Sequence, residues 1–356
     1  MKSIPRLQPG PLALLGSGET SASGRRAFEW LFRRLEPPVR VAILETPAGF
    51  QPNSRQVAQD VADFLEAHLP AYRPAVTIVP ARKRGTPFSP DDTALIDDVL
   101  AADCIFLGPG SPTYAARQLR GSALWDAVRA GYATGAALIL ASAAVLAVGA
   151  HTLPVYEIYK AGFDLEWYPG LDLLGTAGAS VTFVPHWNNR EGGAGLDTSH
   201  CFVGPERFAT LRAMLPSDVP VVGIDEHTAL IVDPEGLGWV LGAGEVTIER
   251  AGEARSHASG ESFPLAEIEH FDWNALVGSV SEDLLRRAAR LRLDAPPEDR
   301  PEPVPTEVHH LVERREAARK AREWRLADAL RAEIAQRGYQ VQDTPDGPRV
   351  SVTSPG

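Results

Sequence analysis

The sequence predicts an α/β protein with a mainly parallel sheet that carries helices on both faces, followed by a small C-terminal helical appendage. Apolar runs typical of buried strands alternate with helical periodicity through the first half of the chain, which indicates parallel strands joined by helices. Several of these runs end in glycine turns. A charged, proline-rich stretch at 296–305 indicates a stiff linker. We therefore expect one domain at 1–295 and a separate unit at 306–356.

Two kinds of apolar spacing place the elements of the first half. Short apolar runs bounded by turn residues predict strands, and apolar residues three and four positions apart predict helices. The expected strands lie at 12–15, 39–44, 76–79, 103–107 and 137–140. The expected helices lie at 27–35, 54–68 and 91–100, and one further helix carries Tyr114, Leu119, Leu124, Trp125 and Val128.

The remainder of the first domain contains more predicted strand than helix. Strands are expected at 155–160, 181–187, 219–224 and 229–232, and residues 239–241 are expected to form a hairpin with 246–249. Helices are expected at 205–215 and near 273–292. The last of these closes the domain.

Composition and charge restrict the classes of function. Hydrophobic residues make up 44% and charged residues 23% of the chain, as in ordinary globular proteins. The net charge of −11 argues against a broad nucleic-acid-binding face, and two cysteines require no disulfide framework. The sequence shows no signal-peptide pattern and no apolar run near the roughly 20 residues that cross a bilayer. We therefore expect a cytoplasmic protein that does not bind membranes.

Ser142 is the candidate nucleophile. Residues 137–140 predict the end of a buried strand, the small residues 141–144 follow, and an apolar helix start comes next. Such a strand–turn–helix exposes its turn residue at the carboxyl end of the sheet, beside N–H groups that can hold an oxyanion. A serine that only caps the helix explains the same pattern.

A serine nucleophile needs a base and a carboxylate that orients the base. His186 is well placed as the base because it ends an apolar strand and enters a glycine-rich loop. A loop histidine packed on Trp187 is the alternative. Glu157 lies between two tyrosines in the strand predicted at 155–160, where a lone carboxylate otherwise faces solvent. The competing bases and carboxylates are His200, His227, Asp164, Asp225 and Glu226.

Five stretches are informative together. They are Leu15-Gly16-Ser17-Gly18-Glu19, Phe106-Leu107-Gly108-Pro109-Gly110-Ser111-Pro112, Ala141-Ser142-Ala143-Ala144, Val184-Pro185-His186-Trp187 and Gly223-Ile224-Asp225-Glu226-His227-Thr228-Ala229-Leu230. In this order, over about residues 10–235, they resemble the peptidase family that includes cyanophycinase and the aspartyl dipeptidases. That family belongs to the class I glutamine-amidotransferase-like fold.

The resemblance implies a serine-type peptidase that needs no metal and no cofactor. Ser142 would be the nucleophile, His186 the base, and Glu157, fifteen positions after the serine, the third member. The oxyanion hole would use the N–H of Gly110 or Ser111, together with Ala143. We expect substrate contacts from Glu19, Asn188, Asn189, Arg190, Asp225 and Glu226.

Three departures from the family pattern narrow this expectation. Leu140 and Ala144 stand where the family's serine has small flanking glycines, and Leu140 is bulky for a tight turn. The stretch 188–191 replaces the arginine-rich continuation of cyanophycinases, so no aspartyl-arginine polymer is assigned as substrate. Glutaminases of this fold use a cysteine at the position of Ser142.

The C-terminal unit has a resemblance of its own. Residues 312–321, 326–331 and 343–349 are similar to the tail of cysteinyl-tRNA synthetase, a region that helps hold tRNA in that family. Leu326, Leu330 and Ile334 form a helical stripe, and Asp346-Gly347 predicts a tight turn. Two roles stay open, which are tRNA contact and docking to a protein. The side chains that would meet phosphates are Arg314, Arg315, Arg319, Lys320 and Arg322.

The sequence thus predicts a hydrolase that cleaves a peptide or isopeptide bond through a Ser–His–Glu triad, acting on dipeptides or chain ends. We expect it to form a homo-oligomer. The alternative is a non-catalytic binding protein on the same fold, with tRNA as a partner through residues 306–356.

Overall fold

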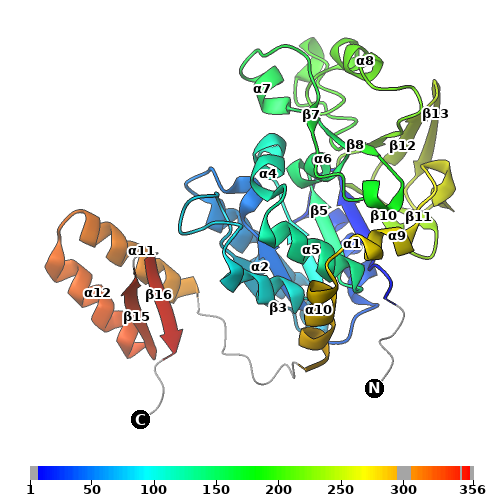
Figure 1. Ribbon diagram of the computed structural model, residues 1–356. Helices are drawn as coiled ribbons and strands as arrows, with labels where there is room; N and C mark the ends of the chain where they lie inside the picture. The colour runs from blue at the N-terminus through cyan, green and yellow to red at the C-terminus, as the bar shows by residue number, and fades with distance from the viewer. Residues whose placement is uncertain (1–6, 295–305, 345–346, 353–356) are drawn as a thin grey trace. The chain divides into compact units, whose positions relative to one another are not determined.

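The computed structural model describes residues 7–294, 306–344 and 347–352. Its chain divides into two compact units, Met1–Ala295 and Pro296–Gly356 (Figure 1). The linker predicted at 296–305 lies outside the described residues, so its stiffness stays a prediction.

A large central sheet of eight strands organises the first unit, in the order β14-β11-β10-β1-β5-β4-β2-β3. In chain order these strands are β1 (Leu12–Leu15), β2 (Arg40–Leu44), β3 (Ala75–Val79), β4 (Cys104–Leu107), β5 (Ala137–Ala141), β10 (Thr228–Asp233), β11 (Leu237–Gly242) and β14 (Ser262–Pro264). The five strands from β1 to β3 in the sheet order are parallel. The other three add antiparallel pairs. The fold is therefore mixed α/β, with a parallel half built by the residues before position 142.

Helices cover both faces of this sheet. Along β1, Leu12 and Leu14 belong to one apolar core, whereas Ala13 and Leu15 belong to a second core on the opposite face, as expected when side chains alternate. The second core is closed by α1 (Ala22–Phe32) and α2 (Ser54–His68). The first is closed by α3 (Ile96–Leu100), α5 (Ala123–Ala133), α6 (Ala143–Val148), α9 (Trp273–Gly278) and α10 (Glu282–Asp294). Within the described ranges, every helix is too short or too polar to cross a lipid bilayer.

A second, four-stranded sheet lies in the same unit, in the order β13-β12-β9-β8. Its strands are β8 (Thr182–Val184), β9 (Val221–Ile224), β12 (Glu245–Arg250) and β13 (Glu253–Ala258). A third core packs α7 (Val155–Tyr159) and α8 (Pro205–Ala213) against β8 and β9. The remaining elements of the unit are α4 (Pro112–Leu119), β6 (His151–Thr152), β7 (Tyr168–Pro169) and the short 3₁₀ turns Thr46–Ala48, Pro70–Tyr72, Thr93–Leu95, Gly175–Ala177, Gly193–Gly195 and Leu265–Glu267.

Two predicted helices are interrupted. The helix expected from Tyr114 to Val128 is divided into α4 and α5 at Gly121, whose φ of 64° ends the first helix. Ser122 then caps the second by accepting the Trp125 N–H. The closing helix expected near 273–292 is likewise divided into α9 and α10.

Two strand predictions are wrong. Residues 155–160 form the helix α7, in which Val155 and Ile158 are buried at a spacing of three while Tyr156 is exposed, so the apolar period is helical. The expected hairpin of 239–241 with 246–249 does not form. Instead β11 pairs with β10 and β14, and β12 pairs with β9 and β13, because the chain passes from one sheet to the other after Gly242.

The C-terminal unit consists of two helices and a two-stranded sheet. Its elements are α11 (Thr306–Lys320), α12 (Trp324–Gln336), β15 (Tyr339–Thr344) and β16 (Gly347–Val352). Leu330 and Ile334 lie in its apolar core as predicted. Leu326 does not, since it is 44% exposed and Ala327 takes the buried position beside it. The turn predicted at 346–347 lies partly outside the described residues.

Candidate active site

Ser142 occupies a strained turn at the carboxyl end of β5. It precedes α6 and has a φ of 51° and a ψ of −109°, a conformation that is uncommon for a residue other than glycine. Its side chain does not cap the helix, so the hydroxyl is free to face another group. Leu140, which seemed bulky for a tight turn, is buried in the first core and is accommodated there.

The imidazole of His186 contacts the Ser142 hydroxyl. His186 Nε2 lies 2.8 Å from Ser142 Oγ, and the histidine side chain is 15% exposed. His186 also has a positive φ, 52°, because the chain turns sharply after β8. This geometry suits proton transfer between hydroxyl and ring.

Glu226 is the carboxylate that meets the other ring nitrogen. Its Oε1 lies 3.1 Å from His186 Nδ1 and accepts a hydrogen bond from Asn189 Nδ2 at 2.8 Å. The Glu226 N–H donates to Asn188 Oδ1 at 2.9 Å. The hydrogen bond with His186 is the main cause that lowers the pKa of Glu226, so the side chain is an anion near neutral pH. A Glu226 anion assigns the Nδ1–H tautomer to His186, which leaves Nε2 as the acceptor for the serine hydroxyl.

The parallel pairing of β8 and β9 brings these two residues together. The strands are neighbours in the second sheet, and His186 and Glu226 each stand two positions after the end of their strand. Residues that follow adjacent parallel strands share one edge of a sheet. A search for polar residues just after both strands would have found Glu226 as the partner of the base.

The role expected for Glu157 needs correction. Its Oε1 accepts a hydrogen bond from Thr113 Oγ1 at 2.5 Å, and Thr113 Oγ1 lies 3.1 Å from Ser111 Oγ. No hydrogen bond or ion pair among the described residues joins Glu157 to His186. The helix α7 turns Glu157 toward the start of α4, and the carboxylate beside the base is Glu226.

The loop after β4, the parallel neighbour of β5, has a specialised backbone. Gly110 has a φ of 151°, and a Cβ there would collide with the carbonyl oxygen of Pro47. The Ser111 N–H donates to that same oxygen at 3.0 Å, so it is not available for an oxyanion. Across the described chain, no hydrogen bond uses the N–H of Gly110 or of Ala143. Of the three expected oxyanion donors, Gly110 and Ala143 therefore keep an unused N–H.

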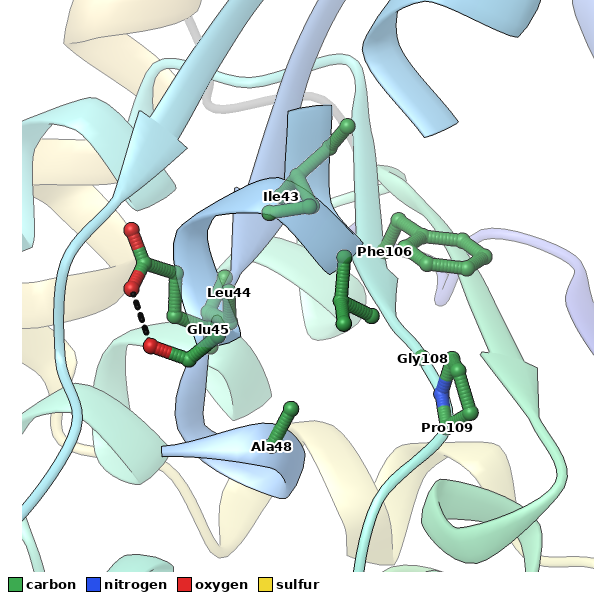
Figure 2. A pocket seen from close by; sticks show the side chains of 10 residues that line it. Ile43, Leu44, Glu45, Ala48, Phe106, Gly108 and Pro109 are labelled. Atoms are coloured by element: carbon green, nitrogen blue, oxygen red, sulfur yellow. Dashed lines mark hydrogen bonds between the residues drawn. The ribbon is translucent and has the colours of Figure 1, made fainter. Parts of the chain in front are cut away.

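A buried carboxylate directly precedes the turn on which Gly110 rests. Glu45 follows β2, and its side chain is fully buried. Its Oε2 accepts from Arg82 Nε at 2.5 Å and from Ser54 Oγ at 3.1 Å. The dashed line in Figure 2 marks the bond to Ser54, and Gly108 and Pro109 lie across a cavity of about 10 Å³ from Glu45 and Ala48. We call Glu45, Ser54 and Arg82 the Glu45 cluster. It joins the end of β2 to the start of α2 and to the segment after β3, on either side of the turn that contains Pro47.

Replacing Glu45 by glutamine is expected to destabilise the first unit. A hydrogen bond to a charged group contributes about 1.5–3 kcal/mol to stability. The substitution removes the negative charge that faces Arg55 and Arg82. The free energy of unfolding in urea should fall by an amount in that range. Glu282→Gln is the matched control, because its pair with Arg286 is exposed to solvent and such pairs contribute little to stability. Equal stability of both variants would contradict the role of the cluster.

The other residues expected to bind substrate have different surroundings. The side chains of Asn188 and Asn189 hydrogen-bond Glu226. Asp225 is 7% exposed and accepts the Glu245 N–H at 3.0 Å, and burial raises the pKa of its carboxyl. Glu19 is half-buried in the loop after β1, and Arg190 is exposed. Substrate contact by Glu19 and Arg190 stays a prediction.

The competing bases lie away from the serine hydroxyl. The His200 ring stacks on Phe208 with centroids 4.6 Å apart, and its Nδ1 lies 2.9 Å from Ser199 Oγ. Burial lowers the pKa of His200. His227 has a φ of 55° and donates its N–H to Ser17 Oγ at 3.0 Å. Asp164, the remaining carboxylate considered, is exposed.

The C-terminal segment is similar in sequence to known proteins. A family model described as the cysteinyl-tRNA ligase anticodon binding domain matches residues 302–349. The cysteine–tRNA ligase of Methanosarcina mazei is 53% identical over 49 residues, which cover 14% of this chain and 10% of that protein. That of Chlamydia abortus is 55% identical over 47 residues, 13% of this chain and 10% of the relative. The chain thus spans about a tenth of the length of the curated relatives it matches, and the predicted resemblance of this segment is confirmed.

The comparison with solved structures finds one peptidase of similar fold. The crystal structure of a peptidase from an acI-B1 Actinobacterium superposes with a TM-score of 0.56 at 21% identity, covering 72% of this chain and 97% of that chain. A putative peptidase E protein from Listeria monocytogenes EGD-e gives a TM-score of 0.43 at 14% identity, covering 70% and 98%. The first of these likenesses confirms the predicted resemblance at the level of the fold.

Proposed function

We propose that the first unit is a serine-type peptidase that cleaves a peptide or isopeptide bond. The observation that carries this proposal is the hydrogen-bonded series Ser142–His186–Glu226, with distances of 2.8 and 3.1 Å. The strained backbone of the serine and the unused N–H groups of Gly110 and Ala143 support it. The fold of a peptidase, shared at low identity, agrees with it.

Each of these residues has a separate role in the reaction. Ser142 Oγ attacks the carbonyl carbon of the scissile bond while His186 Nε2 takes its proton. The Glu226 carboxylate stabilises the resulting imidazolium. The N–H groups of Gly110 and Ala143 donate to the oxygen that becomes negative. His186 then gives the proton to the leaving amine, and water, activated by the same imidazole, releases the acyl group from Ser142.

The proposal is tested by incubating the full chain with a defined mixture of dipeptides and isopeptide-linked dipeptides in ¹⁸O-labelled water. The wild type should release products that carry the label in the new carboxyl group. Ser142→Ala should release none above the background. Absence of labelled products from folded wild-type protein would contradict hydrolysis and would favour the non-catalytic binding protein.

For the C-terminal unit we propose contact with tRNA. The match to an anticodon-binding domain favours this role over protein docking. Trp324 is 59% exposed at the start of α12, and Arg322 and Arg325 beside it are exposed. An exposed ring flanked by guanidinium groups can stack on an unpaired base while the cations meet phosphates. Arg315, one of the residues expected to meet phosphate, is instead buried and paired with Glu316.

Trp324→Ala in the full chain should weaken binding to bulk tRNA. Stacking on an aromatic side chain contributes about 1–3 kcal/mol per base, which is about 5- to 150-fold in affinity. Fluorescence anisotropy with labelled tRNA at several salt concentrations measures this change. Leu326→Ala is the control, since Leu326 is exposed on the same helix but carries no ring. No binding by the wild type at low salt would overturn tRNA contact and leave the docking role.

A further inference from the structure

A left-handed turn lies directly against the base of the proposed site. Three consecutive residues, His200, Cys201 and Phe202, have φ values of 56°, 58° and 69°. Each such residue costs about 1–2 kcal/mol relative to a right-handed conformation, and strain of this kind concentrates at functional sites. The turn therefore needs interactions that hold it.

Backbone hydrogen bonds hold the turn against the segment of the base. The His200 N–H donates to the carbonyl of Trp187 at 2.8 Å, and the Cys201 N–H donates to the carbonyl of His186 at 3.1 Å. Cys201 is 1% exposed in the third core, and burial raises the pKa of its thiol, so it anchors the turn as a neutral apolar residue. These two hydrogen bonds thus fix the turn relative to the backbone of His186.

The consequence is an aromatic wall beside the imidazole. The Phe202 ring lies 5.6 Å from the His186 ring and 5.6 Å from the Tyr159 ring, both measured between centroids. Phe202 is half-buried, and Tyr159 on α7 is 36% exposed. We call this pair, Phe202 and Tyr159, the aromatic wall. It is reachable from solvent and continuous with the base.

The side of the site on which the wall lies decides what it can bind. In peptide hydrolysis the imidazole must reach the nitrogen of the leaving amine to protonate it. A side chain next to the imidazole therefore borders the leaving residue. Aromatic rings favour apolar and, above all, aromatic partners in offset or edge-to-face contact.

We infer that the aromatic wall is a subsite for the residue released as the amine, and that it selects peptides with an aromatic side chain after the scissile bond. This inference rests on the proposed peptidase function, because it assigns the substrate class of the same site. It names Phe202 and Tyr159 as specificity-determining residues.

The test uses a fluorophosphonate, which reacts with an activated serine without requiring a known substrate. Phenylalaninamide and alaninamide stand in for two leaving amines and compete with the probe. An aromatic contact contributes about 0.5–1.5 kcal/mol, so phenylalaninamide should halve the labelling rate of the wild type at about 3- to 10-fold lower concentration than alaninamide. In Phe202→Leu and Tyr159→Ala, this concentration ratio should fall toward one. Phe163→Ala is the matched control, because its ring is 60% exposed and belongs to a neighbouring segment.

The outcomes separate the two proposals. Absence of labelling in folded wild-type protein would overturn the peptidase function itself. Labelling that is slowed equally by both amides would overturn the aromatic subsite while leaving the nucleophile intact. An unchanged ratio in both wall variants would also overturn it. A role of Phe202 in folding alone would alter labelling without altering the ratio.

Discussion

Glu226→Gln is expected to lower the rate of peptide hydrolysis by about 10⁴-fold, as when the orienting carboxylate of a serine triad is made neutral. The amide keeps the shape of the side chain but loses the charge that stabilises the imidazolium of His186. One carboxylate oxygen also becomes an NH₂ group, which can only donate, so the side chain no longer fixes the Nδ1–H tautomer of the ring. The rate constant at saturating substrate should show most of the loss, since Glu226 acts through the base.

Glu157→Gln is the matched control for this prediction. Glu157 is the other glutamate considered as the third member, yet it hydrogen-bonds Thr113 instead of the base. Its substitution should therefore retain most of the rate of the wild type. A loss for Glu157→Gln as large as that for Glu226→Gln would show that the orienting carboxylate has been misassigned.

Gly110→Ala is expected to reduce hydrolysis by about 10²- to 10³-fold, the effect of losing one oxyanion donor. The added methyl group would meet the carbonyl oxygen of Pro47, and the φ of 151° is unfavourable for alanine. The loop must then move, and the Gly110 N–H moves with it. Steady-state kinetics should show a lower rate constant with little change in the Michaelis constant.

Gly121→Ala is the control for Gly110→Ala. It introduces backbone strain at a positive φ without displacing the loop that contains Gly110. Gly121 has a positive φ of 64°, but nothing lies within 4 Å of the added methyl group. This variant should lose some stability and keep its rate. If Gly110→Ala retained wild-type activity, the oxyanion would have to be held by groups other than this loop.

The sequence carried enough information to single out Ser142 and His186, whose side chains lie within hydrogen-bond distance of each other. Ser142 follows an apolar run that is fully buried as β5, and His186 follows a run that is buried as β8. Each prediction needs only a local pattern, which is a strand that ends in a turn. The strained backbone of both residues is not visible in the sequence, because positive φ values occur here at residues other than glycine.

The position of Glu226, the proposed orienting carboxylate, could not be predicted from local pattern alone. Glu226 becomes the partner of His186 only because β9 pairs in parallel with β8. The two residues lie forty positions apart along the chain. Glu157 was predicted because the resemblance places the acid about fifteen positions after the serine, and the segment around it was separately expected to be a strand. The helix α7 changes where the side chain points.

The two sheets show the same limit at the level of the fold. Parallel strands before residue 142 were predictable because each is a short apolar run, buried in all but the edge strand β3, and helices lie between the runs. The hairpin expected across 242–244 was wrong because the alternation of apolar and polar residues predicts a strand but does not say which strand it pairs with. The two strands join different sheets. The C-terminal unit was recognised from its sequence, over a segment that is about half identical to tRNA ligases.

The most direct test of the central claim is mass spectrometry of the chain after reaction with a fluorophosphonate. The claim is that His186, held by Glu226, activates one particular hydroxyl. We expect a single adduct per chain, located on Ser142 by peptide mapping, and no adduct in His186→Ala over the same time. An adduct on a different residue, equal labelling of His186→Ala, or no adduct on folded wild-type protein would contradict the claim.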